Sequence, residues 1–428
     1  MSRHPIAAAI AALLLLPAGR AAAAQAQPGA GPAAVPPAVA PAASPAAKER
    51  FTYDLRLATW GGGFDGLGVR RQSGGLAVVE ASGRPQIKGE GWYLDVPVKI
   101  AHRQTFGTDL SETKGSLDLE AWYVASKRLR LGLDAGLSGA SRKDWPDLYQ
   151  PTNGLGGALL STDRYSYLAW RVGPRLYARP APHQHLRASY RFVSYDYGTD
   201  PAFDPDPITG DAMHLTPRDR TEHRVDLSWR YHQDSWRIGA TLDYTRREFK
   251  TLLARNRRTG ATPNNGPGGT ESNPKQELTI WQPAAEVTLM RMGGKLEVSL
   301  GYGLDVWNDP YQGYYSLTAH VPKAQVQLEL GEKLGVKAGL SGWYATYTAD
   351  GSSRVEVPGA RRKSSRTTLE GEGEYKLTGA LSLRAQVEWT TRSTNYRDFV
   401  PPPNGTSSYD IDWDYTNLWV LAGIQYRL

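Results

Sequence analysis

The chain has 428 residues, of which 50 are Lys or Arg and 43 are Asp or Glu, and it contains no cysteine. The lack of cysteine excludes a disulfide framework and thiolate metal sites. The net charge of +7 is not gathered into the dense basic patch that nucleic-acid binding needs, so we expect no nucleic-acid partner. The 23 Tyr and 13 Trp far outnumber the 7 Phe, and such amphipathic rings favour boundaries between apolar and wet surroundings.

The N-terminal residues predict export. Residues 1–26 combine a basic start, the apolar run 6–19 and a group of small residues, which is the pattern of a signal peptide cleaved after Ala24 or Ala26. The alternative, a membrane anchor, is disfavoured because the run is too short to span a bilayer. Residues 27–50 are rich in Ala and Pro and nearly uncharged, and they indicate an extended periplasmic linker without a packed core.

Residues 51–428 alternate between apolar and polar side chains with a period of two, which is the pattern of β-strands with one dry face. Leu129, Leu131 and Leu133, for example, alternate with Arg130 and Asp134. We predict strand cores at 51–60, 76–83, 91–104, 115–126, 128–139, 163–178, 184–197, 219–232, 235–249, 276–290, 293–307, 313–328, 331–348, 364–377, 379–393 and 415–428. Segment 51–90 fits this series least well, because its glycine-rich stretch 60–75 either hides a further strand or forms a loop.

The connections between these strands are of two kinds that alternate along the chain. Tight turns are expected at 125–128, 180–184, 232–235, 292–294, 331–333 and 377–380. Long polar segments are expected at 140–162, 198–218, 250–275, 350–362 and 394–413. An antiparallel meander with one plain rim and one decorated rim is typical of a transmembrane barrel, which has short periplasmic turns and long external loops.

The length and polarity of the strands favour a barrel over a soluble β-sandwich. The predicted strands run to about 12–16 residues, whereas strands of soluble sheets average about 5–6. Their polar faces carry full charges at regular intervals, as a wet lumen requires. We therefore predict an all-β fold, an antiparallel transmembrane up-and-down β-barrel of about 16 strands within a range of about 14–18, formed by residues 51–428.

The last segment, 417–428, keeps the alternation to its final residue, with Leu418 and Val420 on the apolar face. It resembles the assembly signal at the end of bacterial outer-membrane barrels, in which a glycine precedes alternating apolar residues and a large terminal one. Gly423, Tyr426 and Leu428 fill those places, with Leu428 where Phe or Trp is commoner. The resemblance implies the outer membrane of a Gram-negative bacterium, with the barrel-assembly machinery, outer-membrane lipid and lipopolysaccharide as partners.

Side chains on the polar face should line the lumen. A basic wall is predicted from Arg171, Arg175, Arg187, Arg191, Arg224, Arg230 and Arg237. An acidic wall is predicted from Glu370, Glu372, Glu374 and Glu388. Such walls would create a transverse field that favours polar solutes in an aqueous pore, and the alternative is that these residues form salt bridges inside a plugged barrel.

Aromatic residues are also expected in the lumen, namely Tyr93, Trp122, Tyr167, Trp343 and Tyr347. Rings beside charged hydrogen-bonding groups suit carbohydrate, although simple packing among lumen side chains explains them equally well. The leading hypothesis is a conduit for saccharide or polysaccharide, similar in size and polarity to polysaccharide-export barrels, with periplasmic export components as possible partners. A general diffusion porin is the sibling interpretation.

Two other functions are weaker alternatives. A membrane-embedded hydrolase would need a Ser/His or Asp/His constellation, and no G-x-S-x-G or H-E-x-x-H motif occurs, so we expect no enzyme, no catalytic residues and no cofactor. His183 and His185 belong to a predicted turn and give only a weak metal signal. An adhesin or scaffold would act through loops such as 198–218, where Asp200, Asp204, Asp206 and Asp211 cluster without a known calcium spacing, and 250–275, with Arg255, Arg257 and Arg258.

Overall fold

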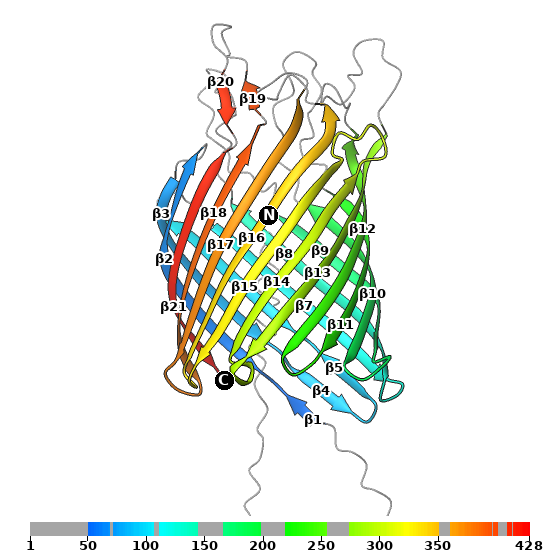
Figure 1. Ribbon diagram of the computed structural model, residues 1–428, viewed down its shortest axis with the longest axis vertical. Coiled ribbons are helices and arrows are strands. Elements are labelled where there is room, and N and C mark those ends of the chain that lie inside the picture. Colours follow the sequence, from blue (N-terminus) through cyan, green and yellow to red (C-terminus); the bar gives the residue numbers. More distant parts are fainter. Residues whose placement is uncertain are drawn as a thin grey trace, which may run out of the picture.

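Antiparallel strands make up nearly all of the described chain (Figure 1). The computed structural model describes residues 50–68, 72–106, 111–143, 166–197, 219–254, 274–350, 360–395, 397–400, 409–412 and 414–428. The predicted signal peptide, residues 1–26, and nearly all of the predicted linker lie outside this part of the chain. Among the described residues, no helix has the length and apolar character needed to span a bilayer.

The first three strands are each interrupted once, at matching positions. The pieces are β1 (Arg50–Thr52) and β2 (Leu55–Gly68), β3 (Gln72–Gly83) and β4 (Gln86–Gly89), and β5 (Trp92–Asp95) and β6 (Val98–Phe106). Pro85 and Pro97 stand at two of the gaps and cannot donate a ladder hydrogen bond. The backbone of Arg84 donates to Asp54 O (2.8 Å) and that of Val96 donates to Pro85 O (3.0 Å). The pairing register continues unchanged across each gap, so each pair of pieces acts as one strand.

Thirteen further strands follow, each paired with the one before it or, for the last, with β18. They are β7 (Ser111–Val124), β8 (Leu129–Lys143), β9 (Tyr167–Ala178), β10 (Gln184–Tyr197), β11 (Arg220–His232), β12 (Trp236–Leu253), β13 (Lys275–Arg291), β14 (Leu296–Asn308), β15 (Leu317–Leu330), β16 (Leu334–Asp350), β17 (Arg361–Lys376), β18 (Leu381–Thr394) and β21 (Tyr415–Arg427). The described residues of the glycine-rich stretch 60–75 therefore extend β2 and β3 and add no separate strand.

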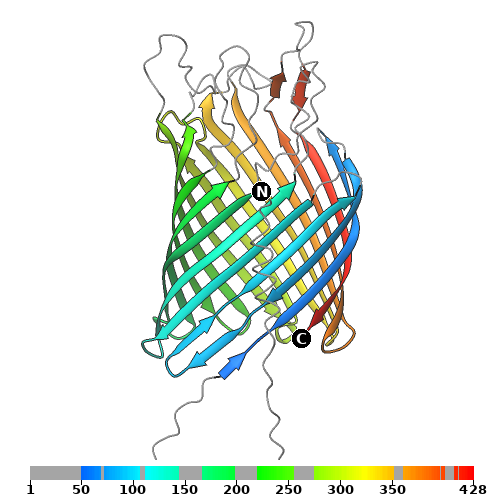
Figure 2. The same cartoon turned by 180° about the vertical axis from the view of Figure 1, so that it is seen from behind.

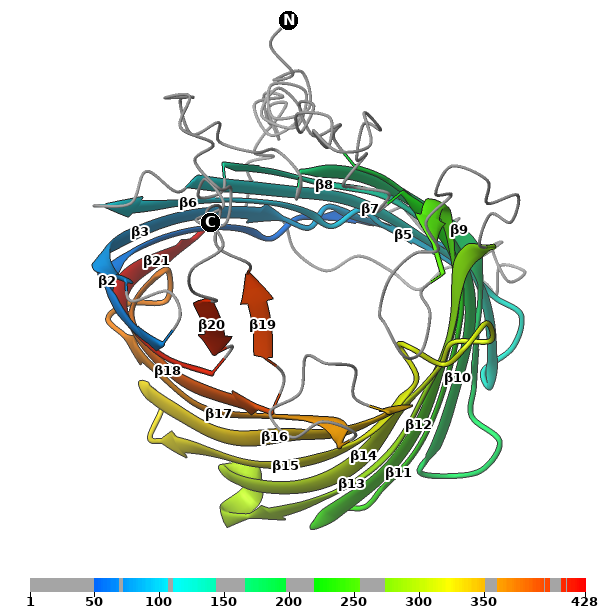
Figure 3. The ribbon, with the colours of Figure 1, turned by 90° about the horizontal axis from the view of Figure 1, so that it is seen from above.

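The last strand closes the barrel on the first. β21 pairs with β2 from Arg56 opposite Arg427 to Gly68 opposite Tyr415, and Leu428 N–H donates to Leu55 O (2.9 Å). The described residues thus form a closed antiparallel barrel of 16 strands, which confirms the predicted fold class and strand number (Figures 2 and 3). Closure matters because it leaves no open sheet edge to be satisfied in lipid.

The two rims differ as the sequence predicts. All six predicted tight turns join strands at one rim, which also holds the turn between β4 and β5, where Gly91 takes a φ of +77° (Figure 1). The short 3-10 turn η1 (Met292–Gly294) is one of them. We call this rim the short-turn end. The described strand ends that flank the predicted long segments lie at the opposite rim, and most residues of those segments lie outside the described part of the chain.

Part of one long connection is described at that opposite rim. The short strands β19 (Arg397–Val400) and β20 (Tyr409–Asp412) pair with each other and not with the barrel. They stand beyond the ends of the barrel strands in Figure 1 and within the barrel outline in Figure 3. This two-stranded sheet therefore lies over the lumen.

The outer face is apolar. Exposed outward-pointing side chains include Leu57, Val79, Leu131, Leu133, Leu137, Trp170, Val172, Leu227, Trp281, Val287, Leu289, Leu300, Val326, Leu340, Leu369, Leu383, Val387, Leu418, Val420 and Ile424. Rings lie toward both rims, with Tyr53, Trp92, Tyr123, Tyr375 and Tyr426 near the short-turn end. An exposed apolar band bordered by Tyr and Trp is the surface that a barrel presents to lipid.

The interior contains little apolar core. Leu317, Ala319 and Ala345 form one buried cluster, and Trp307, Trp343 and Tyr347 pack against it. Most other buried side chains along the strands are small, polar or charged. The sheet is therefore stabilised by backbone pairing and by polar contacts on its inner face, since its apolar side chains point outward.

Candidate functional site: the inner wall

Strand register decides which side chains enter the lumen. Arg187 on β10 stands opposite Ser228 on β11, and Ser228 stands opposite Thr241 on β12. Their neighbours in the chain, such as Leu186 and Leu227, are exposed on the outer face. Because successive side chains of a strand alternate between the two faces, one register fixes the inner set for the whole strand.

This register places the seven arginines of the predicted basic wall on the inner faces of β9 to β12. The four glutamates of the predicted acidic wall lie on the inner faces of β17 and β18. Figure 3 shows these two groups of strands on different sides of the barrel. Whether either wall acts on a solute stays a prediction.

Carboxylates are interleaved with the first of these arginines. Asp134 on β8 is fully buried, at 0% exposure, and accepts from Arg171 Nε (2.8 Å) and pairs with Arg175 Nη2 (3.0 Å). Arg171 Nη2 also lies 2.9 Å from Asp118 Oδ1 on β7, across the intervening strand. Gly136 makes this contact possible, because a Cβ there would lie 2.5 Å from Asp118 Oδ1.

A second buried carboxylate joins three arginines nearer the opposite rim. Glu222 on β11 has 0% exposure, and its oxygens accept from the Nε atoms of Arg220 (2.7 Å), Arg224 (2.7 Å) and Arg247 (2.8 Å). Arg224 also donates to the Tyr195 hydroxyl (2.9 Å). Charge-assisted bonds of this kind satisfy the carboxylate away from water and fix the guanidinium groups against the wall.

The two predicted walls are thus mixed in charge. Arg191 pairs with Asp226, Glu372 with Arg384, and Lys337 Nζ lies 3.8 Å from Glu370 Oε1. The sequence pattern places the acidic residues on the polar face and predicts salt bridges only as the alternative to two separate walls, without specifying the pairs. The available signal was that Asp118, Glu120, Asp134, Glu222 and Asp226 share the inward parity of their strands.

The predicted lumen aromatics pack into the wall. Tyr93 stacks on Trp122 with 6.0 Å between ring centroids, and Tyr167 lies 5.8 Å from Tyr195 and 5.5 Å from Tyr197. In a separate contact, the Arg362 guanidinium lies 4.4 Å from the Tyr347 ring centroid. Trp343 donates its Nε1–H to Asp305 Oδ2 at 2.9 Å. Each of these rings has another ring or a polar group beside it. This arrangement fits both packing within the wall and contact with a saccharide.

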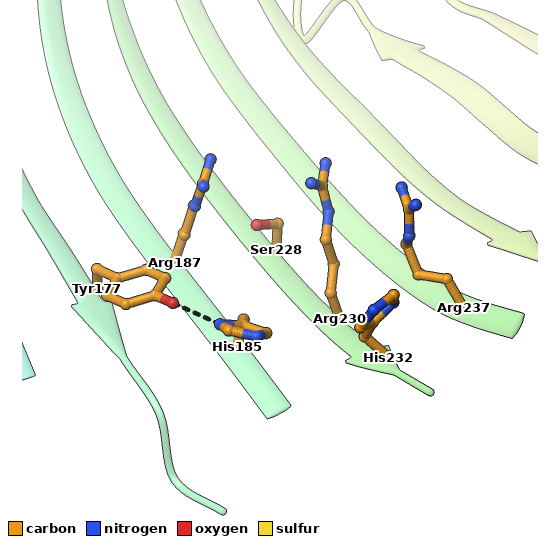
Figure 4. Close-up of a pocket in the computed structure, with 7 residues that line it drawn as sticks. All are labelled: Tyr177, His185, Arg187, Ser228, Arg230, His232 and Arg237. Atoms are coloured by element: carbon orange, nitrogen blue, oxygen red, sulfur yellow. Dashed lines mark hydrogen bonds between the residues drawn. The ribbon is translucent and has the colours of Figure 1, made fainter. Parts of the chain in front are cut away.

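Cavities along the described inner wall include the following three. One of about 560 Å³ is lined by Tyr93, Glu120, Trp122, Arg130, Asp226 and residues around them. One of about 430 Å³ lies beside Trp419, whose ring contacts Phe64 (5.4 Å between centroids) and Arg103 (4.4 Å). The third, of about 270 Å³, lies at the short-turn end and is drawn in Figure 4. All three combine rings with charged groups.

The remaining predicted residues fall in separate places. Gly423 stands opposite Trp60, and Tyr426 opposite Leu57, in the closing pair of strands, while Leu428 donates its N–H to Leu55 O (2.9 Å). Their role as an assembly signal stays a prediction. The aspartates of 198–218 and the arginines of 250–275 named above lie outside the described residues.

The histidines of the H-x-H pair separate. His183 is in the turn, whereas His185 is in β10, with Nδ1 bonded to the Tyr177 hydroxyl. The described residues bring no three His, Cys, Asp or Glu side chains together as a metal site.

The sequence matches no protein-family model, and it matches no curated protein. The three solved structures of similar fold that follow are distant in sequence. A bacterial polysaccharide outer membrane secretin is 10% identical, covering 88% of this chain and 98% of its own, with a TM-score of 0.42. A loop-deletion mutant of OmpT, an outer membrane protein of Vibrio cholerae, is 12% identical, covering 89% and 99%, with a TM-score of 0.41. The TodX monoaromatic hydrocarbon channel is 11% identical, covering 88% and 90%, with a TM-score of 0.36.

Proposed function

We propose that this barrel lies in the outer membrane of a Gram-negative bacterium and conducts hydrophilic molecules, with saccharide or polysaccharide as the preferred cargo. The observation that carries the proposal is the division of faces. Apolar side chains cover the outside, while charged and aromatic side chains on the inside surround cavities of up to about 560 Å³. A barrel of about 16 strands is wide enough to leave an aqueous channel along its axis.

The chemistry of the inner wall supports saccharide over small ions alone. The cavity of about 560 Å³ sets Tyr93 and Trp122 beside Glu120, Arg130 and Asp226. Rings offer a flat apolar surface to the C–H face of a sugar, while carboxylates and guanidinium groups bond its hydroxyls. A general diffusion porin would need water-filled space but no such pairing of rings with polar groups.

The proposal is tested with purified protein in two assays. In planar bilayers we expect stepwise single-channel conductance. In liposome swelling we compare the entry of neutral sugars of increasing length. We expect long oligosaccharides to enter faster than their size alone predicts, because contacts with the wall offset the free-energy cost of confining them. Permeation that falls with size alone would favour a general porin. Absence of conductance at every voltage would reject a conduit of either kind.

Deletion of the gene separates export from uptake. If the cargo is secreted polysaccharide, the deletion strain accumulates it in the periplasm and loses it from the medium, and the intact gene restores secretion. Unchanged secretion in a strain that lacks the barrel would reject the export assignment while leaving conduction of other solutes intact.

A further inference from the structure

One group of basic residues on the inner wall differs from all the others around it. Arg187, Arg230 and Arg237 lie on the adjacent strands β10, β11 and β12 at the short-turn end, with His185 and His232 beside them. Together with Tyr177 and Ser228 they line the cavity of about 270 Å³. Figure 4 shows the three guanidinium groups extending side by side, with His185 bonded to Tyr177. We call these seven residues the mouth cluster.

The arginines of the mouth cluster are poorly neutralised. Farther from the short-turn end, Arg171, Arg191 and Arg224 each have a carboxylate within hydrogen-bond distance. Among the described residues, by contrast, no carboxylate forms an ion pair with Arg187 or Arg230. Arg237 meets Glu297 only at 3.8 Å. Arg187 and Arg230 are also exposed, so their hydrogen-bond donors face the lumen.

Three neighbouring cations without close counter-ions repel one another, and an anion placed among them relieves that repulsion. Guanidinium groups suit this task because their donors match the two oxygens of a carboxylate or sulfate. The other four members of the predicted basic wall, Arg171, Arg175, Arg191 and Arg224, pair with the protein's own carboxylates. Within the predicted basic wall, the guanidinium groups without a close carboxylate therefore lie at the short-turn mouth of the barrel.

An aromatic groove adjoins the mouth cluster. The cavity of about 560 Å³ shares Tyr177, Arg187 and Ser228 with the smaller one, so the two lie side by side. Within it, Trp122 lies flat against Gly132, where a Cβ would come within 2.7 Å of the indole ring. A flat ring next to free guanidinium groups fits a sugar that carries a negative charge better than it fits a bare inorganic anion.

We propose that the mouth cluster and its adjoining groove bind a negatively charged saccharide, one bearing carboxylate or sulfate groups, as it enters the barrel from the short-turn end. The assignment rests on the proposed conduit function. Arg187, Arg230 and Arg237 hold the acidic groups, and Trp122 and Tyr93 contact the sugar ring. In an outer-membrane barrel the short turns face the periplasm, so this site serves cargo that leaves the cell.

The test uses current block in planar bilayers. Oligogalacturonate of fixed length, a sulfated oligosaccharide, a neutral maltooligosaccharide of the same length and sodium sulfate are each added to one side. We expect the two charged oligosaccharides to block from the short-turn side at far lower concentration than the neutral one. The double variant R187Q/R230Q should raise the half-blocking concentration at least about tenfold, because hydrogen bonds to charged groups are lost.

The matched control is K99Q/K323Q. This variant also removes two positive charges, but from inward positions on β6 and β15. If block depends on a local binding site and not on the overall electrostatic potential of the lumen, it should change the half-blocking concentration by less than about twofold. Equal effects of the two double variants would overturn the site, as would equal block by the neutral sugar. Competition by sodium sulfate at the oligomer's own concentration would overturn the saccharide assignment.

Binding is measured separately from conduction by calorimetry on the detergent-solubilised full chain. Oligogalacturonate should bind the wild type and K99Q/K323Q alike and bind R187Q/R230Q at least about tenfold more weakly. If the protein conducts no current but shows this binding pattern, the conduit proposal fails and the binding site stands. If it conducts but shows no difference among variants, the conduit stands and the mouth cluster is not a binding site.

Discussion

At the scale of single residues, the barrel stabilises buried carboxylates by surrounding each with guanidinium groups. Glu222 is the extreme case, because three arginines donate to one side chain that water does not reach. Breaking a buried pair by removing one partner is costly, since the remaining charges stay desolvated and uncompensated. Glu222 therefore holds together a cationic cluster that would otherwise repel itself.

Replacing Glu222 with glutamine tests this role. The amide keeps the shape but removes the negative charge, so we expect Glu222→Gln to lower the free energy of unfolding by about 3–5 kcal/mol. Urea unfolding in lipid vesicles, followed by tryptophan fluorescence, measures it. The control is Glu248→Gln on β12, where Glu248 forms an exposed pair with Arg246 (3.0 Å) and should contribute about 1 kcal/mol or less. Equal losses in the two variants would contradict the buried-cluster account.

At the scale of strands, each strand has one face toward lipid and the other toward the wet lumen. In β21, Val420 points outward with 50% exposure, whereas its neighbour Leu421 points inward and lines the cavity beside Trp419. The two side chains are similar in size and adjacent in sequence. They differ only in the medium that they face.

This difference predicts opposite tolerance to charge. Val420→Arg places a guanidinium group in the middle of the lipid-facing band and should destabilise the folded barrel by about 2–4 kcal/mol. Leu421→Arg places the same group in a wet lumen and should cost less than about 1 kcal/mol. The same urea unfolding assay, with the shift of the folded band on unheated gels as a second readout, compares them. Similar losses would mean that the assigned faces of β21 are wrong.

At the scale of the whole molecule, the barrel depends on one pairing between residues at the two ends of its sequence. β2 and β21 are more than 300 residues apart in the chain, yet they form a ladder as regular as those of sequential hairpins. An Arg427 Nε–Asp54 Oδ1 contact of 3.0 Å lies at the base of the same seam. Without the pairing of β2 with β21, two strand edges would face lipid unpaired.

Closure can be tested by disulfide formation because the chain has no native cysteine. Ala58 stands opposite Gln425, three residues along β2 from Leu55, which forms a hydrogen-bonded pair with Leu428. Hydrogen-bonded and non-hydrogen-bonded pairs alternate, so Ala58 and Gln425 form a non-hydrogen-bonded pair, with Cα atoms about 4.5 Å apart. That spacing suits a disulfide. We expect Ala58→Cys with Gln425→Cys to cross-link on mild oxidation and to run faster on denaturing gels without reductant.

The control for closure shifts the second cysteine by one residue. Ala58→Cys with Ile424→Cys puts the two thiols on opposite faces of the sheet, so it should remain uncross-linked under the same oxidation. Cross-linking of both pairs would indicate a mobile seam. Cross-linking of neither would indicate that β2 and β21 are not neighbours.

Alternation along the sequence predicted the strands, their approximate number and the two rims. A period of two assigns each side chain to a face, and Leu418 and Val420 are exposed on the outer surface as their alternation requires. The tight turns followed from short polar breaks between strands. These features are local, so they can be predicted without knowing which strands are neighbours.

Which charges meet, by contrast, depends on contacts between strands that appear only in the folded barrel. Arg171 reaches Asp118 on β7 only because Gly136, on the intervening strand β8, has no side chain in the way. Likewise, three arginines from two strands converge on Glu222. Such contacts depend on register between strands and on the space left by their neighbours, which alternation does not specify. For the same reason, the sequence grouped seven arginines into one wall, while the structure separates the neutralised ones from Arg187 and Arg230, which remain exposed at the short-turn mouth.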